Sequence, residues 1–324
     1  MTARQENTRF AFRDTLIELA AKDKRIVLVC ADSALVVKAG DFQERYPDRF
    51  FDVGIAEQNA VCVAAGLASC GLIPFFATYS GFITMRACEQ IRTFVAYPNL
   101  NVKFVGANGG MASGEREGVT HQFFEDVGIV RTISGVNIVV PADASQVKEA
   151  VRAVAGIEGP CFIRIGSGRD PVVADDGGVP FSFGQARILR DWGSDVAIFV
   201  MGFVMNRALE AADRLKHEGI NATVVDVHTL RPLDVESITA VLQRTRAAVT
   251  VEDHNIIGGL GSAIAEVSAE EMPAHLVRIG LRGVYPESGL PDPLLDKYHI
   301  GVVDIVNAAK KVIAKKALTT SFKR

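Results

Sequence analysis

Three segments of the chain place polar and aromatic side chains where chemistry could be done: residues 50–68, 75–92 and 114–133. In the first, Glu57 stands at the head of an almost wholly apolar helical pattern. The N-terminus of a helix favours a carboxylate, whereas removal from water disfavours its charge. The residues alone therefore leave two interpretations open: an ordinary helix-terminal charge, or a buried carboxylate that holds or moves a proton.

The other two segments contribute aromatic rings and a histidine. Tyr79 and Phe82 follow an expected strand and lie in a loop, where they form either a stacking platform or part of the core. His121 lies in a glycine-containing loop, between a threonine and a glutamine. Because histidine titrates near neutral pH, this position is a candidate for proton transfer.

The elements that must position these side chains alternate between strand and helix patterns. Short apolar runs predict strands at Ile26–Cys30, Phe50–Val53, Leu72–Ala77, Val102–Val105, Asn137–Val140 and Cys161–Ile165. Helices are expected at Arg9–Ala21, Gly40–Tyr46, residues 57–70, Ala87–Ala96, Phe123–Ile129 and Ala144–Ala155. Continuous apolar strands that alternate with helices predict a parallel sheet covered on both faces.

Between residues 166 and 184 the composition changes to glycine, proline and aspartate, which is typical of a linker. We expect a first domain at residues 1–172, a linker at 173–185 and a second domain at 186–324. In the second domain, strands are expected at Val196–Met201, Ala222–Val227, Ala247–Val251 and His275–Ile279. Helices are expected at Asn206–Glu218, Asp234–Gln243, Ser262–Glu270 and Val303–Ala317. The predicted fold class is α/β, with two three-layer domains.

Composition excludes several classes of protein. The 324 residues carry a net charge of −3, so no nucleic-acid partner is expected. Five cysteines without a C-x-x-C pair indicate reduced thiols and a cytoplasmic location. Residues 60–85 hold no charge, but Gly66, Gly71 and Pro74 interrupt them. We therefore expect a buried helix and strand there, and no membrane span.

Three motifs, in this order, resemble those of transketolases. They are D-V-G-I-A-E-Q-N-A-V at residues 52–61, A-T-Y-S-x-F at 77–82 and E-G-x-T-H-Q at 117–122. Over essentially its whole length the chain is similar to the C-terminal half of a transketolase, a thiamine-diphosphate enzyme. That half comprises the pyrimidine-binding domain, here residues 1–172, and the small C-terminal domain, which VVDVHTLRPLD and VEDHNIIGGLGSAIAE also fit.

The resemblance implies roles for individual residues. Glu57 matches the glutamate that contacts the aminopyrimidine ring of thiamine diphosphate and favours the tautomer that takes a proton from the thiazolium carbon. Phe82, with Tyr79, matches aromatic residues that pack against this ring. His121 matches a histidine that contacts the sugar donor and can move protons. Arg164 matches an arginine that grips the sugar phosphate.

Several positions depart from the family pattern. Glu117 stands where the family has an aspartate, one methylene shorter, that reads a donor hydroxyl, and the family's phosphate-binding histidine is missing near Asn108. At the end of the first strand Cys30 replaces a serine, with Asp32 beside it, and Met85 stands where a third aromatic residue is expected. The resemblance thus assigns Met85 to the cofactor, and Asp32 and Glu117 to a substrate whose recognition is altered.

A whole domain of the family is missing, because the chain has no G-D-G metal motif. Mg²⁺ would hold the diphosphate through hard oxygen ligands, and this sequence has no obvious set of them. The resemblance therefore implies a partner chain that carries the Mg²⁺ ligands and the diphosphate-binding domain. The cofactor would lie at the interface, and symmetry favours an α₂β₂ assembly.

The leading interpretation is the C-terminal subunit of a split transketolase, which moves a two-carbon ketol unit from a ketose phosphate to an aldose phosphate. The alternatives are half of a deoxyxylulose-phosphate synthase and the β subunit of a 2-oxo acid dehydrogenase, which normally lacks the E-G-x-T-H-Q loop. From a different class, a non-catalytic regulatory subunit is a further alternative. Glu57, Phe82 and His121 together argue against it. The sequence does not identify the donor sugar, which is either xylulose 5-phosphate or a rarer ketose, such as apulose 4-phosphate or a sulfosugar.

Overall fold

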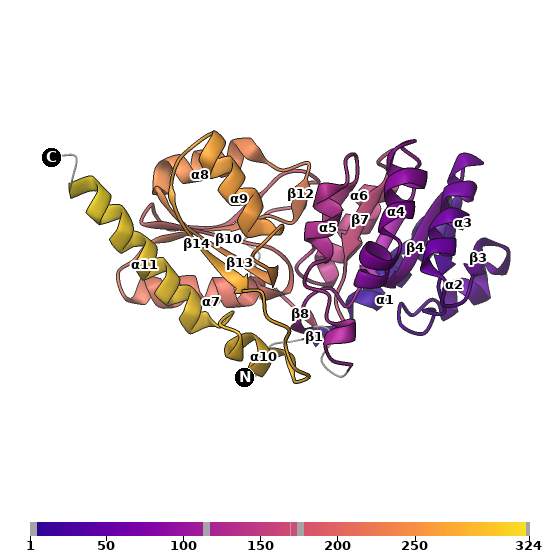
Figure 1. Ribbon diagram of the computed structural model, residues 1–324, viewed down its shortest axis with the longest axis horizontal. Helices are drawn as coiled ribbons and strands as arrows, with labels where there is room; N and C mark the ends of the chain where they lie inside the picture. The colour runs from indigo at the N-terminus through magenta and orange to yellow at the C-terminus, as the bar shows by residue number, and fades with distance from the viewer. Residues whose placement is uncertain (1–4, 113–116, 169, 174–177, 322–324) are drawn as a thin grey trace.

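The computed structural model describes residues 5–112, 117–168, 170–173 and 178–321 (Figure 1). It contains two α/β units side by side, each with a central sheet between helices. The expected fold class of two three-layer α/β domains is confirmed. Residues 174–177 of the expected linker and 114–116 of the third motif segment lie outside the described residues.

The first sheet has seven strands in the order β12-β6-β7-β5-β4-β2-β3, and every pair except β12 with β6 is parallel. Its strands are β2 (Ile26–Cys30), β3 (Phe50–Asp52), β4 (Ile73–Tyr79), β5 (Lys103–Ala107), β6 (Asn137–Val139), β7 (Cys161–Arg164) and β12 (Thr229–Arg231). The helical segments around it are α1 (Thr8–Lys22), α2 (Gly40–Arg45), η1 (Pro47–Arg49), α3 (Glu57–Ser69), the π-helical turns η2 (Phe82–Arg86) and η3 (Ile91–Ala96), α4 (Cys88–Gln90), η5 (Val119–His121), α5 (Asp126–Thr132) and α6 (Ala144–Ala155).

Alternation along the strands explains why helices cover both faces of this sheet. Successive side chains of a strand point to opposite faces. Val29, Phe76 and Phe104 belong to the core cluster that includes α3, η3 and α5. Leu28 and Phe75 belong to the cluster on the other face, with α1 and α6. All five side chains are fully buried, as the continuous apolar strand patterns predict.

The second sheet has five strands in the order β14-β13-β10-β11-β9, of which only β9 is antiparallel to its neighbour. Its strands are β9 (Arg187–Asp191), β10 (Val196–Val200), β11 (Ala222–Asp226), β13 (Ala247–Asn255) and β14 (His275–Leu281). The helical segments are η6 (Gly202–Val204), α7 (Met205–His217), α8 (Val235–Thr245), α9 (Leu260–Glu270), α10 (Pro291–Lys297) and α11 (Val302–Ser321). The face under α8 and α9 shares one hydrophobic cluster with the first domain, so the two cores are continuous.

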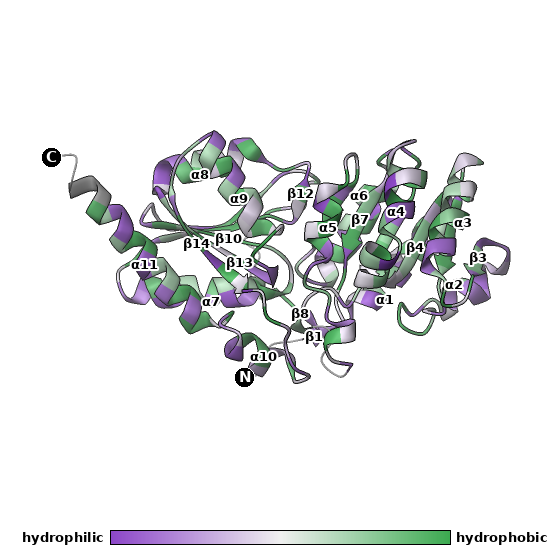
Figure 2. Ribbon diagram, in the orientation of Figure 1, coloured by the Kyte–Doolittle hydropathy of each residue, from purple (hydrophilic) through white to green (hydrophobic). Residues whose placement is uncertain are grey.

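Hydropathy in the folded chain follows these layers. Figure 2 shows the strands of both sheets mainly in the green of hydrophobic residues, whereas α7 and α11 alternate between green and purple. The uncharged stretch at residues 60–85 forms most of α3, then β4 and the start of η2, as a buried helix followed by a strand. Among the described residues, no helix combines the length and apolar character that a membrane crossing requires.

Several elements differ from expectation. The helix expected at Phe123–Ile129 begins three residues later, as α5, and the helix expected at Ala87–Ala96 is a run of π and α turns that starts at Phe82. The edge strands β9 and β12 were not predicted, nor were the short pair β1 (Gln5–Glu6) and β8 (Asp170–Pro171) or helix α10. Each of these strands is short or polar, so its apolar pattern is too weak to show in sequence.

Candidate active site

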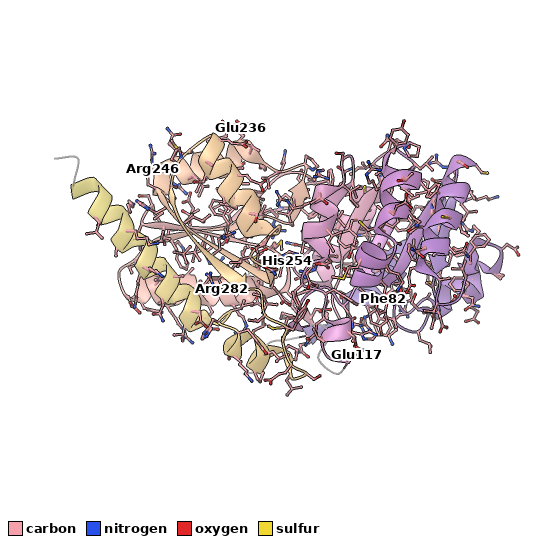
Figure 3. The ribbon with its side chains drawn as sticks, in the orientation of Figure 1. Phe82, Glu117, Glu236, Arg246, His254 and Arg282 are labelled. Atoms are coloured by element: carbon pink, nitrogen blue, oxygen red, sulfur yellow. The ribbon has the colours of Figure 1, made fainter. Side chains whose placement is uncertain are left out.

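The predicted site residues gather at the carboxyl edge of the first sheet. Strands β2, β4 and β5 are parallel neighbours, so their carboxyl ends meet at one edge, where ligands of α/β sheets commonly bind. Tyr79 ends β4, and Asn108 directly follows β5. Figure 3 labels Phe82 and Glu117 at this edge, far from Glu236 and Arg246 on the second domain.

Glu57 is the first residue of α3, and its side chain is buried, with only 2% exposed. Its Oε2 accepts a hydrogen bond from the Arg86 guanidinium at 2.7 Å. The same guanidinium lies over the Phe82 ring, with 4.3 Å from the Arg86 Cζ to the ring centroid. A buried carboxylate thus faces a half-buried aromatic ring, and one arginine contacts both.

Four rings form an aromatic cluster beside this carboxylate: Tyr79, Phe82, His121 and Phe123. The His121 ring lies 4.9 Å from Tyr79 and 5.3 Å from Phe82, edge to face in both cases. Phe82 and Phe123 are 5.2 Å apart. A Cβ on Gly81 would lie 1.9 Å from the Phe123 ring, so this close packing requires glycine there. The structure therefore places His121 against both predicted stacking residues.

Glu117 joins the aromatic cluster to a polar network. Its Oε1 accepts a hydrogen bond from the Tyr79 hydroxyl at 3.2 Å, and its Oε2 accepts one from Asn108 Nδ2 at 3.4 Å. Asn108 Oδ1 in turn accepts a hydrogen bond from Arg9 of helix α1. Burial, followed by the Glu117 charge, raises the pKa of Tyr79 to about 12, so its hydroxyl stays a hydrogen-bond donor at neutral pH.

Arg9 brings a cation to this network. Its Nε donates to the Gly166 carbonyl at 3.4 Å, and burial lowers its pKa although the Asp170, Tyr79 and Glu117 side chains raise it. A guanidinium keeps its charge under such a shift because its pKa starts far above neutrality. The edge of the site therefore holds a partly buried cation close to the hydroxyl and carboxylate groups.

Arg164 ends strand β7 at this edge, but its side chain is enclosed by protein. Its side chain is 1% exposed, its Nε donates to Asp126 Oδ2 at 2.9 Å, and its Nη2 donates to the carbonyls of Phe123 and Asp253. Asp126 also accepts from the Ser80 hydroxyl. The C-terminal domain covers the end of strand β7, so the guanidinium is enclosed between the domains. These contacts do not support a role for Arg164 in gripping a sugar phosphate.

Asp32 and Met85 lie at the margins of the site. Asp32 follows β2 at the same sheet edge, is exposed, and donates its backbone N–H to Asp52 Oδ1 at 2.8 Å. Met85 is 43% exposed in η2, three residues after Phe82. Cys30, which replaces the family's serine, is fully buried, and desolvation raises the pKa of its thiol. Cys30 therefore offers no group to a ligand, whereas Asp32 and Met85 do.

Two charged residues of this arrangement, Arg9 and Arg86, were missed from the sequence. A signal for Arg9 existed: helices that precede parallel strands begin at the carboxyl edge of the sheet, so a cation in the first turn of α1 is a candidate. Arg86 carried no such signal, because its approach to Glu57 depends on how η2 packs against α3.

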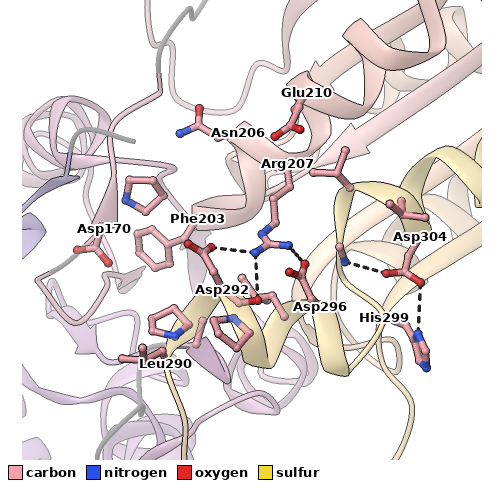
Figure 4. A pocket seen from close by; sticks show the side chains of 18 of the residues that line it. Asp170, Phe203, Asn206, Arg207, Glu210, Leu290, Asp292, Asp296, His299 and Asp304 are labelled. Atoms are coloured by element: carbon pink, nitrogen blue, oxygen red, sulfur yellow. Dashed lines mark hydrogen bonds and ion pairs between the residues drawn. The ribbon is translucent and has the colours of Figure 1, made fainter. Parts of the chain in front are cut away.

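A cavity of about 880 Å³ lies elsewhere, between α7, α10 and the start of α11 (Figure 4). Arg207 lines it and is held by Asp292 at 2.8 Å and Asp296 at 2.5 Å. None of the residues singled out from the sequence lines this cavity. Within the described ranges, no cluster of three or more His, Cys, Asp or Glu side chains is arranged to hold a metal ion.

Comparison with known proteins identifies the family. Residues 4–168 match the transketolase pyrimidine-binding domain, and residues 184–305 match the transketolase C-terminal domain. A 6-deoxy-6-sulfo-D-fructose transketolase subunit, SqwH, of Clostridium sp. is 40% identical, with 95% of each chain covered. A subunit of the apulose-4-phosphate transketolase of Phocaeicola vulgatus is 38% identical over 84% of this chain and 86% of its own.

A solved structure gives the same result. A split-gene transketolase, described as an inactive β4 tetramer, is 40% identical and superposes with a TM-score of 0.85, covering 96% of this chain and 99% of its own. The deoxyxylulose-phosphate synthase alternative also has relatives, such as that of Desulforudis audaxviator at 36% identity over 94% of this chain, but the match spans only 48% of that enzyme. The chain belongs to the transketolase family, as an enzyme subunit built from the pyrimidine-binding and C-terminal domains.

Proposed function

We propose that this chain is the subunit of a two-chain transketolase that supplies Glu57 and the aromatic cluster to thiamine diphosphate at an interface with a partner. The observation that carries this proposal is the unbroken series of contacts at one sheet edge. It runs from Glu57 through Arg86, Phe82 and His121 to Tyr79 and Glu117. A proton-holding group, a stacking surface and a polar substrate end therefore lie side by side.

The residues fit the pyrimidine end of the cofactor. When bound, thiamine diphosphate supplies the nucleophilic carbon that breaks and remakes a carbon–carbon bond of the sugar. Glu57 presents a carboxylate in a buried position at the head of α3, where it can hold a proton on a ring nitrogen. Phe82 and Tyr79 offer aromatic surface for stacking, with Met85 beside them.

The substrate end is assigned to Arg9, Asp32, Glu117 and His121. Thr120 Oγ1 lies 3.0 Å from His121 Nδ1, so Nε2 is the atom through which His121 would exchange a proton with a sugar hydroxyl. Glu117 would accept hydrogen bonds from donor hydroxyls. Arg9 takes the place first given to Arg164, because its guanidinium donates to Asn108, which in turn donates to Glu117, and because a guanidinium suits a phosphate or sulfonate group.

The partner would carry the diphosphate-binding domain with its Mg²⁺ ligands. The relatives named as subunits and as a split-gene enzyme support a second chain. Large apolar side chains on the segments around Glu57 also support it. Leu35, Ile55 and Tyr97 are 88%, 73% and 87% exposed, and Phe94 is 48% exposed. Patches of this kind commonly mark protein interfaces. The assembly that follows is α₂β₂, in the reducing cytoplasm that five free cysteines favour.

The donor class is proposed from the relatives' names together with Glu117. Those names specify a sulfo-sugar and the branched sugar apulose, and Glu117 is longer than the family's aspartate. We therefore propose a sulfonated or branched ketose as a better donor than xylulose 5-phosphate.

The test is reconstitution with a G-D-G-containing partner, thiamine diphosphate and Mg²⁺, followed by an assay of ketol transfer. Glu57→Gln should lower kcat by ~10²–10⁴-fold, because the group that holds the proton is lost. The matched control is Glu89→Gln, an exposed glutamate on the neighbouring α4 that contacts Gln90. If Glu57→Gln keeps more than about half of the wild-type kcat, Glu57 does not hold the proton as we propose, because loss of that group should cost ~10²–10⁴-fold.

A further inference from the structure

Arg86 makes two contacts that compete with the proposed cofactor position. Its Nη1 donates to Glu57 Oε2 at 2.7 Å, and its Cζ lies 4.3 Å from the centroid of the Phe82 ring. The guanidinium is a flat group with N–H donors along its edge, stacked on an aromatic face. An aminopyrimidine ring that stacks on Phe82 is also flat, and its ring nitrogen donates to Glu57 when that nitrogen carries the proton.

Three other aromatic rings of the protein also pack against Phe82. Tyr79, His121 and Phe123 contact its ring edge to face, with centroids 5.5, 5.3 and 5.2 Å away. The surface of Phe82 that a stacking ligand could use on the Glu57 side is therefore the surface that Arg86 covers. The guanidinium and a ring bound in this way exclude each other.

The exposures of the two charged partners differ sharply. The Glu57 side chain is 2% exposed, whereas that of Arg86 is 44% exposed. Arg86 ends the π-helical turn η2, a kind of turn that is often found at functional sites. The arginine can therefore turn outward to solvent while the carboxylate stays in place.

We propose that Arg86 is a positioning residue that occupies the aminopyrimidine position in the cofactor-free chain and leaves it when the cofactor binds. The inference rests on the proposed function. Until loading, Arg86 supplies the counter-charge that a buried Glu57 carboxylate needs, because an unpaired buried charge is strongly destabilising. On loading, the donor to Glu57 changes from Arg86 to the ring, so the carboxylate keeps a partner throughout.

This exchange has a measurable cost. A ligand that binds only one of two conformers shows an apparent affinity reduced by the population of that conformer. The Arg86 side of the ion pair is 44% exposed and the cation–π contact is modest, so displacing both should weaken apparent cofactor affinity by about tenfold. Removing the arginine side chain should therefore raise the apparent cofactor affinity by the same factor.

The experiment is a calorimetric titration of thiamine diphosphate, with Mg²⁺, into the complex of the full chain and its G-D-G partner. Arg86→Met should lower the Kd by about tenfold. Arg86→Lys keeps a charge for Glu57 but loses the flat stacking surface. Its Kd should therefore lie between those of the wild-type chain and Arg86→Met. Arg25→Met is the matched control, because Arg25 makes an ion pair of the same 2.7 Å length with Asp23 on the surface, without an aromatic ring.

The outcomes separate this inference from the proposed function. If the wild-type complex binds the cofactor and Arg86→Met and Arg86→Lys bind it equally or more weakly, the exchange is refuted, and the arginine merely holds Glu57. If the wild-type complex binds no thiamine diphosphate, the proposed function fails and the inference fails with it. Arg86→Lys keeps the test decisive if Arg86→Met does not fold.

Discussion

Replacing Asp226 by Asn is expected to uncover an acid sensitivity of the fold that the wild-type chain hides. Asp226 ends β11, and His228 follows two residues later, both fully buried where the two domains meet. The Oδ2 of Asp226 accepts a hydrogen bond from Gln146 Nε2 at 2.6 Å and lies 3.5 Å from Arg187 Nε. Burial raises the pKa of Asp226 to about 7, although Arg187 lowers it.

The pKa of His228 is shifted in the opposite direction. Its ring stacks on Phe181 with centroids 4.3 Å apart, and its Nδ1 lies 2.8 Å from Thr229 Oγ1. Burial, and then the charge of Arg187, lowers the pKa of His228 to about 3. Between about pH 4 and 6.5 the folded chain therefore holds one proton on Asp226 and none on His228. In the unfolded chain the reverse holds, because the ordinary pKa values of Asp and His bracket this range.

The two effects cancel in the wild-type chain. Stability rises with pH when the unfolded state binds more protons, by at most about 1.36 kcal/mol per pH unit for one proton. His228 alone gives this positive slope, so its contribution is lost as pH falls below about 6.5. Asp226 alone gives the negative slope, so its contribution is lost as pH rises from about 4 to 7. Each contribution amounts to about 4 kcal/mol over its range of about three pH units, and because the two have opposite signs they largely cancel where the ranges overlap.

The assay is urea unfolding of the full chain at half-unit steps from pH 4.5 to 7. Asp226→Asn should lose about 3 kcal/mol of unfolding free energy on acidification across this range, beyond any change in the wild-type chain. His228→Gln should lose a similar amount as pH rises, and the double variant should follow the wild-type slope. Other buried titrating groups are common to all four proteins and leave the differences unchanged. Equal slopes in the two single variants would refute the opposed pKa shifts.

Two further predictions concern the substrate end of the site. Glu117→Asp withdraws the carboxylate from both Tyr79 and Asn108. We therefore expect the ratio of kcat/KM for xylulose 5-phosphate to kcat/KM for a sulfonated or branched ketose to change by about tenfold. An unchanged ratio would contradict the donor proposal. Asp253 accepts the backbone N–H groups of Met111 and Ala112, just before the loop that carries Glu117. Asp253→Asn leaves one of these N–H groups unsatisfied, so the free energy of unfolding, measured with urea, should fall by about 1–3 kcal/mol. The KM for the donor, measured by steady-state kinetics, should rise. An unchanged KM would mean that Asp253 only joins the domains.

Much of the fold could be predicted because burial on both sides leaves a plain mark on a sequence. Strands such as Ile26–Cys30 and Val196–Val200 are apolar at every position, and only the centre of a parallel sheet buries a strand in this way. Strand β12 reads T-L-R and pairs antiparallel with β6 of the other domain. That pairing depends on how the domains dock, so no local pattern of residues could have indicated it.

The same distinction separates the site residues that were predicted from those that were not. Glu57, Phe82 and His121 belong to local motifs on elements whose order is fixed by the parallel sheet, so motif and topology together bring them to one edge. Arg164 also ends a strand at that edge, and an arginine in this position is predicted to bind phosphate. Its position depends on the second domain, whose Asp253 carbonyl accepts from it while Asp126 neutralises its charge. Burial by a distant segment changed a candidate ligand into an interdomain contact. In the function that we propose, the cation at the substrate end is instead Arg9, at the start of the first helix.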